Sequence, residues 1–225
     1  MRAVFVLVGM LTLRNVAGIT LVPQDLYVPV NLAVTAALAL VGRASGVSAS
    51  ELGLSRATVA RGLRIGAAGA ALVAVVLVVA GAVPLTRPLF EDQRVADVDS
   101  GGALAYQALV RIPLGTVVLE EFAFRGVLLA ALARHRSTGV AVAVSSSLFG
   151  LWHIRPTLSA LETNELAADP MARFAAVAAA VAFTALAGMV FCGLRLASRS
   201  LLAPVLVHTA TNSVSMVVAY VVLGG

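Results

Sequence analysis

The sequence predicts an all-α fold, a polytopic bundle of transmembrane helices. Of the 225 residues, 60% are hydrophobic and 12% are charged, whereas a soluble domain is about half apolar and roughly a quarter charged. The mean hydropathy is +0.98. The long Ala, Val and Leu runs lack the alternation of a transmembrane β-barrel, and a spanning backbone must satisfy its own hydrogen bonds. Helices are therefore the expected spanning structure.

Seven segments are apolar enough to be transmembrane helices, given that crossing a core of roughly 30 Å takes about 20 residues. The second and fifth segments are short for a full span, so a re-entrant course or an eighth helix is left open. The expected segments are residues 3–21, 28–42, 65–83, 104–133, 139–154, 173–194 and 201–223. The chain is long enough for one domain, residues 1–225, and shows no linker.

The loops alternate in charge. Arginines gather in loops 43–64, 134–138 and 195–200, while the loops between them hold the acids Glu91, Asp92, Asp97, Asp99, Glu162, Glu165 and Asp169. The positive-inside rule therefore predicts a cytoplasmic N-terminus and an outside C-terminus, in what the composition suggests is a bacterial plasma membrane. Arg155 and Arg173 flank the second acidic loop, so the face to which an active-site cavity opens is left open.

Several other features have simple interpretations. All 16 basic residues are Arg, and no basic run is interleaved with aromatic residues, so we expect no nucleic-acid partner. The single Cys192 lies in an apolar stretch and is expected to be a buried thiol. The apolar run near the N-terminus is broken by Arg14, which favours a first span over a signal peptide. Residues 50–64 allow either an interfacial amphipathic helix or a loop.

Three polar clusters lie inside predicted spans, where an ionisable group costs about 2.5–3.5 kcal/mol and is a functional candidate. In the fourth span, Glu121 and Arg125 stand four residues apart on one helix face and can neutralise each other. Glu120 is about 100° around the helix and is left to point elsewhere. A buried ion network that only fixes helix packing is the alternative.

The second cluster lies in the fifth span, where Phe149 and His153 share a face and Gly150 permits close approach of another helix. An interfacial His beside an aromatic-belt Trp152 is the alternative. The preceding serines, residues 145–147, are better explained as small packing residues than as nucleophiles.

The third cluster lies in the last span, where His208 and Asn212 stand four residues apart and aim into the same space. Hydrogen bonding between helices is the alternative explanation. Taken together, a carboxylate that accepts a proton, a His that helps to hold a water and a His/Asn pair that donates to an oxyanion are the parts of water-mediated amide hydrolysis.

In this order on successive helices, the three motifs resemble the CPBP family of intramembrane proteases, which includes the CAAX prenyl endopeptidases and the bacterial Abi proteins. The motifs are Glu120-Glu121-x-x-x-Arg125, Phe149-x-x-x-His153 and His208-x-x-x-Asn212. The similarity covers residues 104–223, with a weaker likeness at residues 51–54. It implies that Glu120 and His153 activate the attacking water and that His208 and Asn212 stabilise the oxyanion. Glu121, Arg125 and Phe149 would support this geometry.

Metal dependence is left open by this resemblance. Glu120, His153 and His208 could supply three zinc ligands with an open fourth position. No His-Glu-x-x-His helix is present and the three ligands would come from separate helices, so a metal-free mechanism with Glu120 as the base is preferred. The expected partners are the bilayer and a membrane-anchored peptide or protein substrate, whose prenylation is left open.

Two functions of other classes compete with an intramembrane endopeptidase. A non-catalytic scaffold or bacteriocin-immunity protein would keep the motifs for packing and bind a membrane partner. A small transporter or proton relay is disfavoured, because the two halves show neither an inverted repeat nor a matching pair of broken helices.

Overall fold

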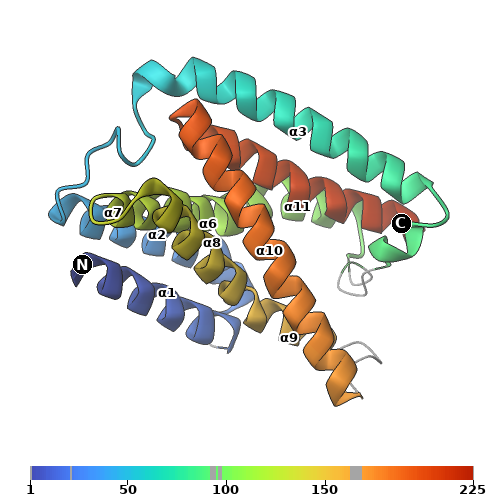
Figure 1. Cartoon of the computed structure of the whole chain (residues 1–225). Coiled ribbons are helices and arrows are strands. Elements are labelled where there is room, and N and C mark those ends of the chain that lie inside the picture. Colours follow the sequence, from blue (N-terminus) through green and yellow to red (C-terminus); the bar gives the residue numbers. More distant parts are fainter. Residues whose placement is uncertain (1, 21, 92–94, 96–97, 163–168, 225) are drawn as a thin grey trace.

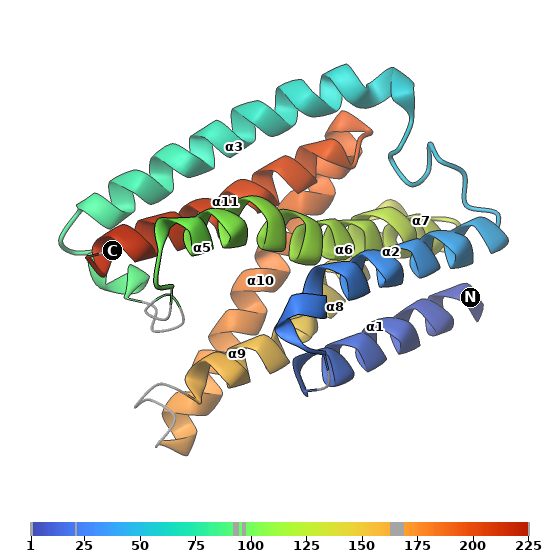
Figure 2. The same ribbon diagram turned by 180° about the vertical axis from the view of Figure 1, so that it is seen from behind.

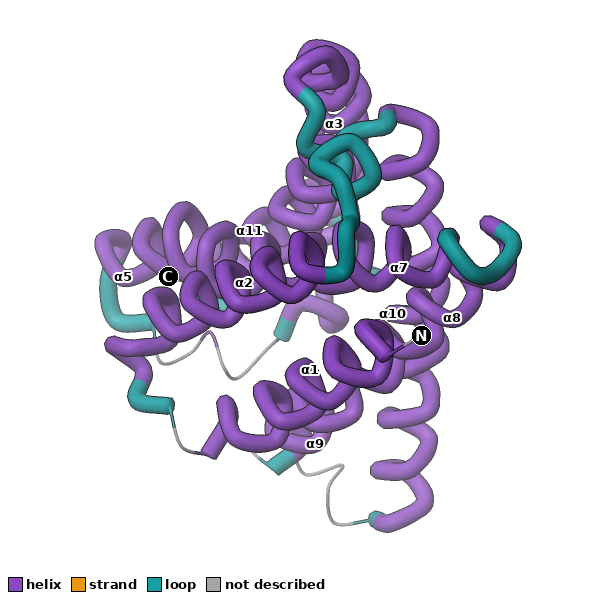
Figure 3. The backbone as a smooth tube through the Cα atoms, turned by 90° about the vertical axis from the view of Figure 1, so that its left-hand side faces the viewer, coloured by secondary structure: helices purple, strands orange, loops and turns teal. Residues whose placement is uncertain are grey.

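The computed structural model describes residues 2–20, 22–91, 95, 98–162 and 169–224, and these contain helices and loops with no strand (Figure 3). Each of the seven predicted segments is helical. The α-helices are α1 Arg2–Thr20, α2 Tyr27–Ala44, α3 Val59–Ala82, α5 Gly101–Tyr106, α6 Val118–Glu121, α7 Leu129–Ala133, α8 Thr138–Trp152, α9 Ile154–Leu161, α10 Pro170–Ser198 and α11 Leu202–Val222. The all-α prediction is therefore confirmed.

The predicted fourth span is one long helix with two wider, π-type stretches. These are η4, Gln107–Val117, and η5, Phe122–Leu128, and the four residues of α6 lie between them. Pro113 lies inside η4 and cannot donate a backbone hydrogen bond. Long π stretches are uncommon and are often found at functional sites, so this helix is where a site is expected.

This long helix is the centre of the bundle. It runs between α2 and α11, and α3 lies along the far side of α11 (Figures 1 and 2). On the other side, α8 packs against α10, which crosses the bundle obliquely (Figure 1). Residues 119–132 are all buried, as expected for a helix that is surrounded by other helices. Any charge in this stretch must find its partners within the protein.

Among the described residues, four helices are long and apolar enough to cross a membrane: Gln24–Ala44, Arg56–Ala82, Pro170–Ser198 and Leu202–Val222. Large apolar side chains such as Leu72 on α3 and Phe183 on α10 point outward. In α1 the apolar stretch is shorter, Val4–Val16, and α8 has 15 residues. The seven-span count therefore stays a prediction. Three of the acids used to orient the chain, Asp92, Asp97 and Glu165, lie outside the described residues.

The segment between α2 and α3 is mainly a loop. Residues 45–55 form turns, a short 3₁₀ turn covers Arg56–Thr58, and α3 begins at Val59. The interfacial-helix interpretation is therefore wrong for residues 50–55, because side-chain contacts with the ends of other helices hold this part of the backbone in turns.

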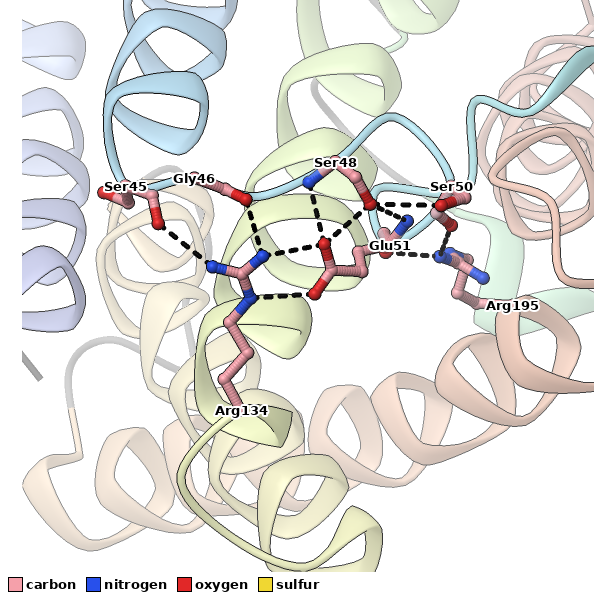
Figure 4. Close-up of polar contacts among 7 residues, drawn as sticks. All are labelled: Ser45, Gly46, Ser48, Ser50, Glu51, Arg134 and Arg195. Atoms are coloured by element: carbon pink, nitrogen blue, oxygen red, sulfur yellow. Dashed lines mark hydrogen bonds and ion pairs between the residues drawn. The ribbon is translucent and has the colours of Figure 1, made fainter.

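One ion pair fastens this loop to the bundle (Figure 4). The guanidinium of Arg134 donates to both carboxylate oxygens of Glu51, each at 2.8 Å. Arg195 at the end of α10 donates to the Glu51 carbonyl at 2.6 Å, and the Gly53 carbonyl accepts from the backbone of Leu201 at 2.9 Å. Gly53 has φ +79° and lies against the Arg195 side chain, so a larger residue does not fit there.

The Arg134 hydrogen bonds lower the pKa of Glu51 to about 2. Because this folded-state pKa lies below the ordinary value of 4.5, the pair stabilises the fold fully above that pH and loses its contribution as the pH falls towards about 2. We expect the melting temperature of the wild type to fall more steeply over this range than that of Glu51→Gln, whose amide does not titrate. Glu91→Gln, at an exposed acid, should follow the wild type. Parallel curves for wild type and Glu51→Gln would contradict this prediction.

The predicted close approach at Gly150 is present between α8 and α10. A Cβ atom there would lie 2.6 Å from the Val181 carbonyl oxygen and 2.9 Å from Ala185 Cβ. Gly150→Ala should therefore force the two helices apart and lower the free energy of unfolding by about 1–3 kcal/mol. Gly193→Ala is the matched control, because a Cβ on that α10 residue meets nothing within 4 Å. Equal stability of the two variants in a denaturation assay would count against the prediction.

Candidate active site

The structure brings residues from all three predicted clusters into one buried group. Glu120 and Glu121 lie in α6, and His208 and Asn212 lie in α11. Arg125 in η5 and Phe149 in α8 complete the group, and His153 lies at its edge, just after α8 ends. Glu120, Glu121, Arg125, Phe149 and His208 are all buried.

Glu121 is the centre of the hydrogen-bond network. Its Oε1 accepts from Arg125 Nη1 at 2.9 Å and lies 2.8 Å from His208 Nδ1. The predicted Glu121–Arg125 pair is therefore present, with both side chains fully buried. Since a carboxylate only accepts, Nδ1 of His208 carries the hydrogen in this contact. Glu121 thus fixes both the orientation and the tautomer of the imidazole.

Glu120 points away from Glu121, as the helix geometry predicted. Its Oε1 accepts from the indole Nε1 of Trp152 at 2.9 Å. Its Oε2 is 3.8 Å from Nε2 of His208 and, within the described part of the chain, receives no hydrogen bond. One oxygen of this buried carboxylate is therefore held in place, while the other has unmet hydrogen-bonding capacity.

Aromatic rings enclose the charged groups. The Arg125 guanidinium carbon lies 3.9 Å from the centre of the Phe149 ring and 5.0 Å from that of Phe191. The His208 ring stacks on Phe191 with centroids 4.8 Å apart. Nε and Nη2 of Arg125 make no hydrogen bond to the described residues. The cation–π contacts with the two rings partly compensate for this loss. The surroundings exclude water and hold the ion pair rigidly.

His208 and Asn212 converge as predicted. Nδ2 of Asn212 lies 3.2 Å from Nε2 of His208, on the side of the ring that faces Glu120. Because Nδ1 of His208 carries its hydrogen, Nε2 accepts from the Asn212 amide in this structure.

His153 is placed differently from the other candidates. α8 ends at Trp152, so His153 caps the helix, and its Nδ1 lies 2.8 Å from the Phe149 carbonyl oxygen. A carbonyl only accepts, so Nδ1 carries the hydrogen and Nε2 is left as an acceptor. The ring keeps the predicted contact with Phe149, at 4.7 Å between centroids.

The zinc-ligand set considered from sequence does not assemble in the described residues. No three His, Cys, Asp or Glu side chains in that part of the chain lie close enough together to hold a metal ion. Each imidazole donates from Nδ1, His208 to Glu121 and His153 to a backbone carbonyl, and this orientation leaves Nε2 as the atom that could bind a metal. The misfit lies in the placement of the side chains, because within the described residues they do not gather into a three-ligand group.

Two residues of the site were missed by the sequence analysis. Trp152 was considered only as an aromatic-belt residue, and its place next to His153 was the available signal that it could reach the same site. Phe191 lies within the apolar α10, and no pattern in the sequence distinguishes it from its neighbours. Trp152 donates a hydrogen bond to Glu120, and Phe191 stacks on the ring of His208. Both contacts join different helices.

Ser145, Ser146 and Cys192 have the packing roles that the sequence predicts, whereas Ser147 is exposed. Ser145 donates to the Phe124 carbonyl at 2.9 Å, and Ser146 lies 3.9 Å from the buried Cys192 sulfur. Each therefore bonds within the interior, and neither of these hydrogen bonds joins a serine to a basic side chain that could activate it as a nucleophile.

Fold and site together define an α-helical protein with a buried Glu/His/Asn site among apolar helices. The family model described as "Type II CAAX prenyl endopeptidase Rce1-like" matches residues 103–214, about half of the chain. The chain belongs to this family, as the motifs indicated. Neither a curated protein nor a solved structure was matched. At family level this is an intramembrane protease with a peptide or protein substrate, and the four apolar helices agree with an integral membrane protein.

Proposed function

We propose that the protein hydrolyses a peptide bond of a membrane-anchored substrate with a water that Glu120 activates. The observation that carries this proposal is the buried Glu120 carboxylate, with one oxygen held by Trp152 and the other free beside His208. A fixed carboxylate with a free oxygen in a water-poor site is suited to act as a general base.

The other side chains have roles that follow from their contacts. Glu120 takes a proton from the water as the water oxygen bonds to the carbonyl carbon, and it returns this proton to the amine that leaves when the C–N bond breaks. The free Nε2 of His153 helps to orient the water. Asn212 donates to the oxyanion, and His208 also donates from Nε2 when the imidazole is protonated. Glu121 then balances the positive charge of the imidazolium. Arg125 holds Glu121 in place. The mechanism routes no step through a metal ion.

The orientation in the membrane is part of the same proposal. The arginine-rich loops support a cytoplasmic N-terminus and an outside C-terminus, and the composition supports a bacterial plasma membrane. Tagging each terminus in cells and probing it with an impermeant reagent tests this orientation. Labelling of the N-terminal tag in intact cells would contradict it.

The test of function is cleavage of a quenched, membrane-anchored peptide library by the protein in nanodiscs, compared with Glu120→Gln and repeated with a chelator. Cleavage by the wild type alone, unaffected by the chelator, supports the proposal. Loss of cleavage in chelator contradicts the metal-free mechanism. A scaffold or immunity protein that binds a membrane partner predicts no cleavage and unchanged partner binding by Glu120→Gln.

A further inference from the structure

Asn15 is a polar residue on the buried face of α1. Val4, Leu7 and Leu11 of this helix are buried, and Asn15 follows Leu11 by four residues, so it lies on the same face. A polar group on such a face needs a hydrogen-bond partner inside the bundle. Since α1 lies outside residues 103–214, which the family model matches, the partner of Asn15 indicates what this helix adds to the site.

The partner of Asn15 is the backbone at the end of α8. Nδ2 of Asn15 donates to the Trp152 carbonyl at 2.7 Å, although the two residues are 137 positions apart in the sequence. In a continuous helix this carbonyl would accept from the N–H four residues later, but that residue is Pro156, which has no N–H. The break at His153 between α8 and α9 thus leaves a carbonyl without a helical partner, and Asn15 supplies the donor.

The side chain of Trp152 connects this hydrogen bond to Glu120. Its indole Nε1 donates to Glu120 Oε1 at 2.9 Å, and its ring packs edge-on against Phe124 at 5.8 Å between centroids. Oε2 of the same carboxylate accepts from no described residue and lies 3.8 Å from Nε2 of His208. The orientation of Glu120 therefore depends on the indole, and without it the carboxylate can turn toward His208.

We propose that Asn15 is a positioning residue for Glu120 and acts through Trp152, an inference that rests on the proposed protease function. The Asn15 hydrogen bond goes to the backbone of Trp152, so its effect on the chemical step passes through the indole. Asn15 fixes the end of α8, α8 fixes the indole, and the indole fixes the carboxylate. A displacement of about 1 Å in a reacting group can lower a rate by about 10²-fold, so this series of contacts is expected to affect kcat.

The test removes the two hydrogen bonds separately and together and measures peptide cleavage by the full chain in nanodiscs. Asn15→Leu keeps the approximate size of the side chain but cannot donate, and Trp152→Phe keeps an aromatic ring without the N–H. Each should lower kcat by about 10- to 100-fold with little change in KM. The double variant should be no slower than Trp152→Phe, because both changes break the same series of contacts.

A conservative variant and a matched control accompany these measurements. Asn15→His should keep most of the wild-type rate, because Nδ1 of His can donate from the same distance along the side chain as Nδ2 of Asn. Thr12→Val removes a polar group from an exposed position of the same helix and should cleave like the wild type. Melting curves confirm that each variant is folded. Asn15→Ser, which is too short to reach the carbonyl, replaces Asn15→Leu if that variant does not fold.

Fluorescence provides a readout that needs no cleavage, because Trp152 is the only tryptophan of the chain. An indole that is held at its backbone and at its ring nitrogen turns with the protein, whereas a released side chain moves within nanoseconds. In detergent micelles, Asn15→Leu should therefore lower the fluorescence anisotropy of Trp152, and Thr12→Val should leave it unchanged.

Three outcomes would overturn the inference while Glu120-dependent cleavage stands. They are a wild-type kcat in Asn15→Leu, a further loss of equal size when Asn15→Leu is added to Trp152→Phe, and an unchanged anisotropy in Asn15→Leu. Absence of cleavage by the wild type, together with lower anisotropy in Asn15→Leu, would instead overturn the proposed function, whereas the link from Asn15 to the indole would stand.

Discussion

Replacing Glu120 with Gln is expected to lower kcat for peptide cleavage by about 10²- to 10⁴-fold, the usual contribution of a general base. The amide keeps the shape of the side chain and can still accept from Trp152, whose Nε1 lies 2.9 Å from Oε1 in the native site. It cannot take a proton from water. KM should change little, because the proposed role of Glu120 is in the chemical step.

The measurement is the initial rate of cleavage by equal amounts of folded protein in nanodiscs. Glu91→Gln, which makes the same chemical change at an exposed position after α3, is expected to cleave like the wild type. Cleavage by Glu120→Gln within a few-fold of the wild type would remove Glu120 from the mechanism. A loss of folded protein in this variant would instead show that the carboxylate supports the fold.

Replacing Arg125 with Met is expected to lower the free energy of unfolding by about 3–5 kcal/mol, the cost of removing one partner of a buried ion pair. Both side chains of the Glu121–Arg125 pair are completely buried. Without the guanidinium, the Glu121 carboxylate loses its compensating charge and keeps only the hydrogen bond to His208. The Met side chain fills similar space between the Phe149 and Phe191 rings.

A double-mutant cycle tests the reason for this loss. Glu121→Gln combined with Arg125→Met removes both charges and should recover part of the lost stability, because no isolated charge stays buried. Arg64→Met on the exposed side of α3 is the control and should be close to neutral. If the double variant is less stable than Arg125→Met, the loss comes from packing, not from the unpaired carboxylate.

The helices and part of the site could be predicted from the sequence because local patterns determine them. Apolar runs of sufficient length located all seven helical segments. The spacing of four residues located the Glu121–Arg125 and His208–Asn212 contacts, since such residues share a helix face. The direction of Glu120 followed from the same geometry. Each of these inferences needs only one helix.

Tertiary contacts explain what could not be predicted. The sequence predicts a helix to residue 154, but α8 ends at Trp152, and His153 after it bonds to the Phe149 carbonyl. The Trp152 indole reaches Glu120 on another helix, a contact that the pattern of one helix does not contain. The π-type stretches around α6 and the stacking of Phe191 on His208 likewise leave no periodic pattern in the sequence.

The two partners of Glu121 lie at very different distances from it along the chain, and this affects how the protein can be inserted during synthesis. Arg125 is four residues away, in the same helical segment, whereas His208 follows 87 residues later. A nascent helix entering the bilayer must carry its charges before the last helix exists, and each isolated charge costs about 2.5–3.5 kcal/mol at the membrane centre. The local pair lets Glu121 and Arg125 enter together as a neutral unit. The ribosome can then finish α11, whose imidazole joins a carboxylate already shielded from lipid.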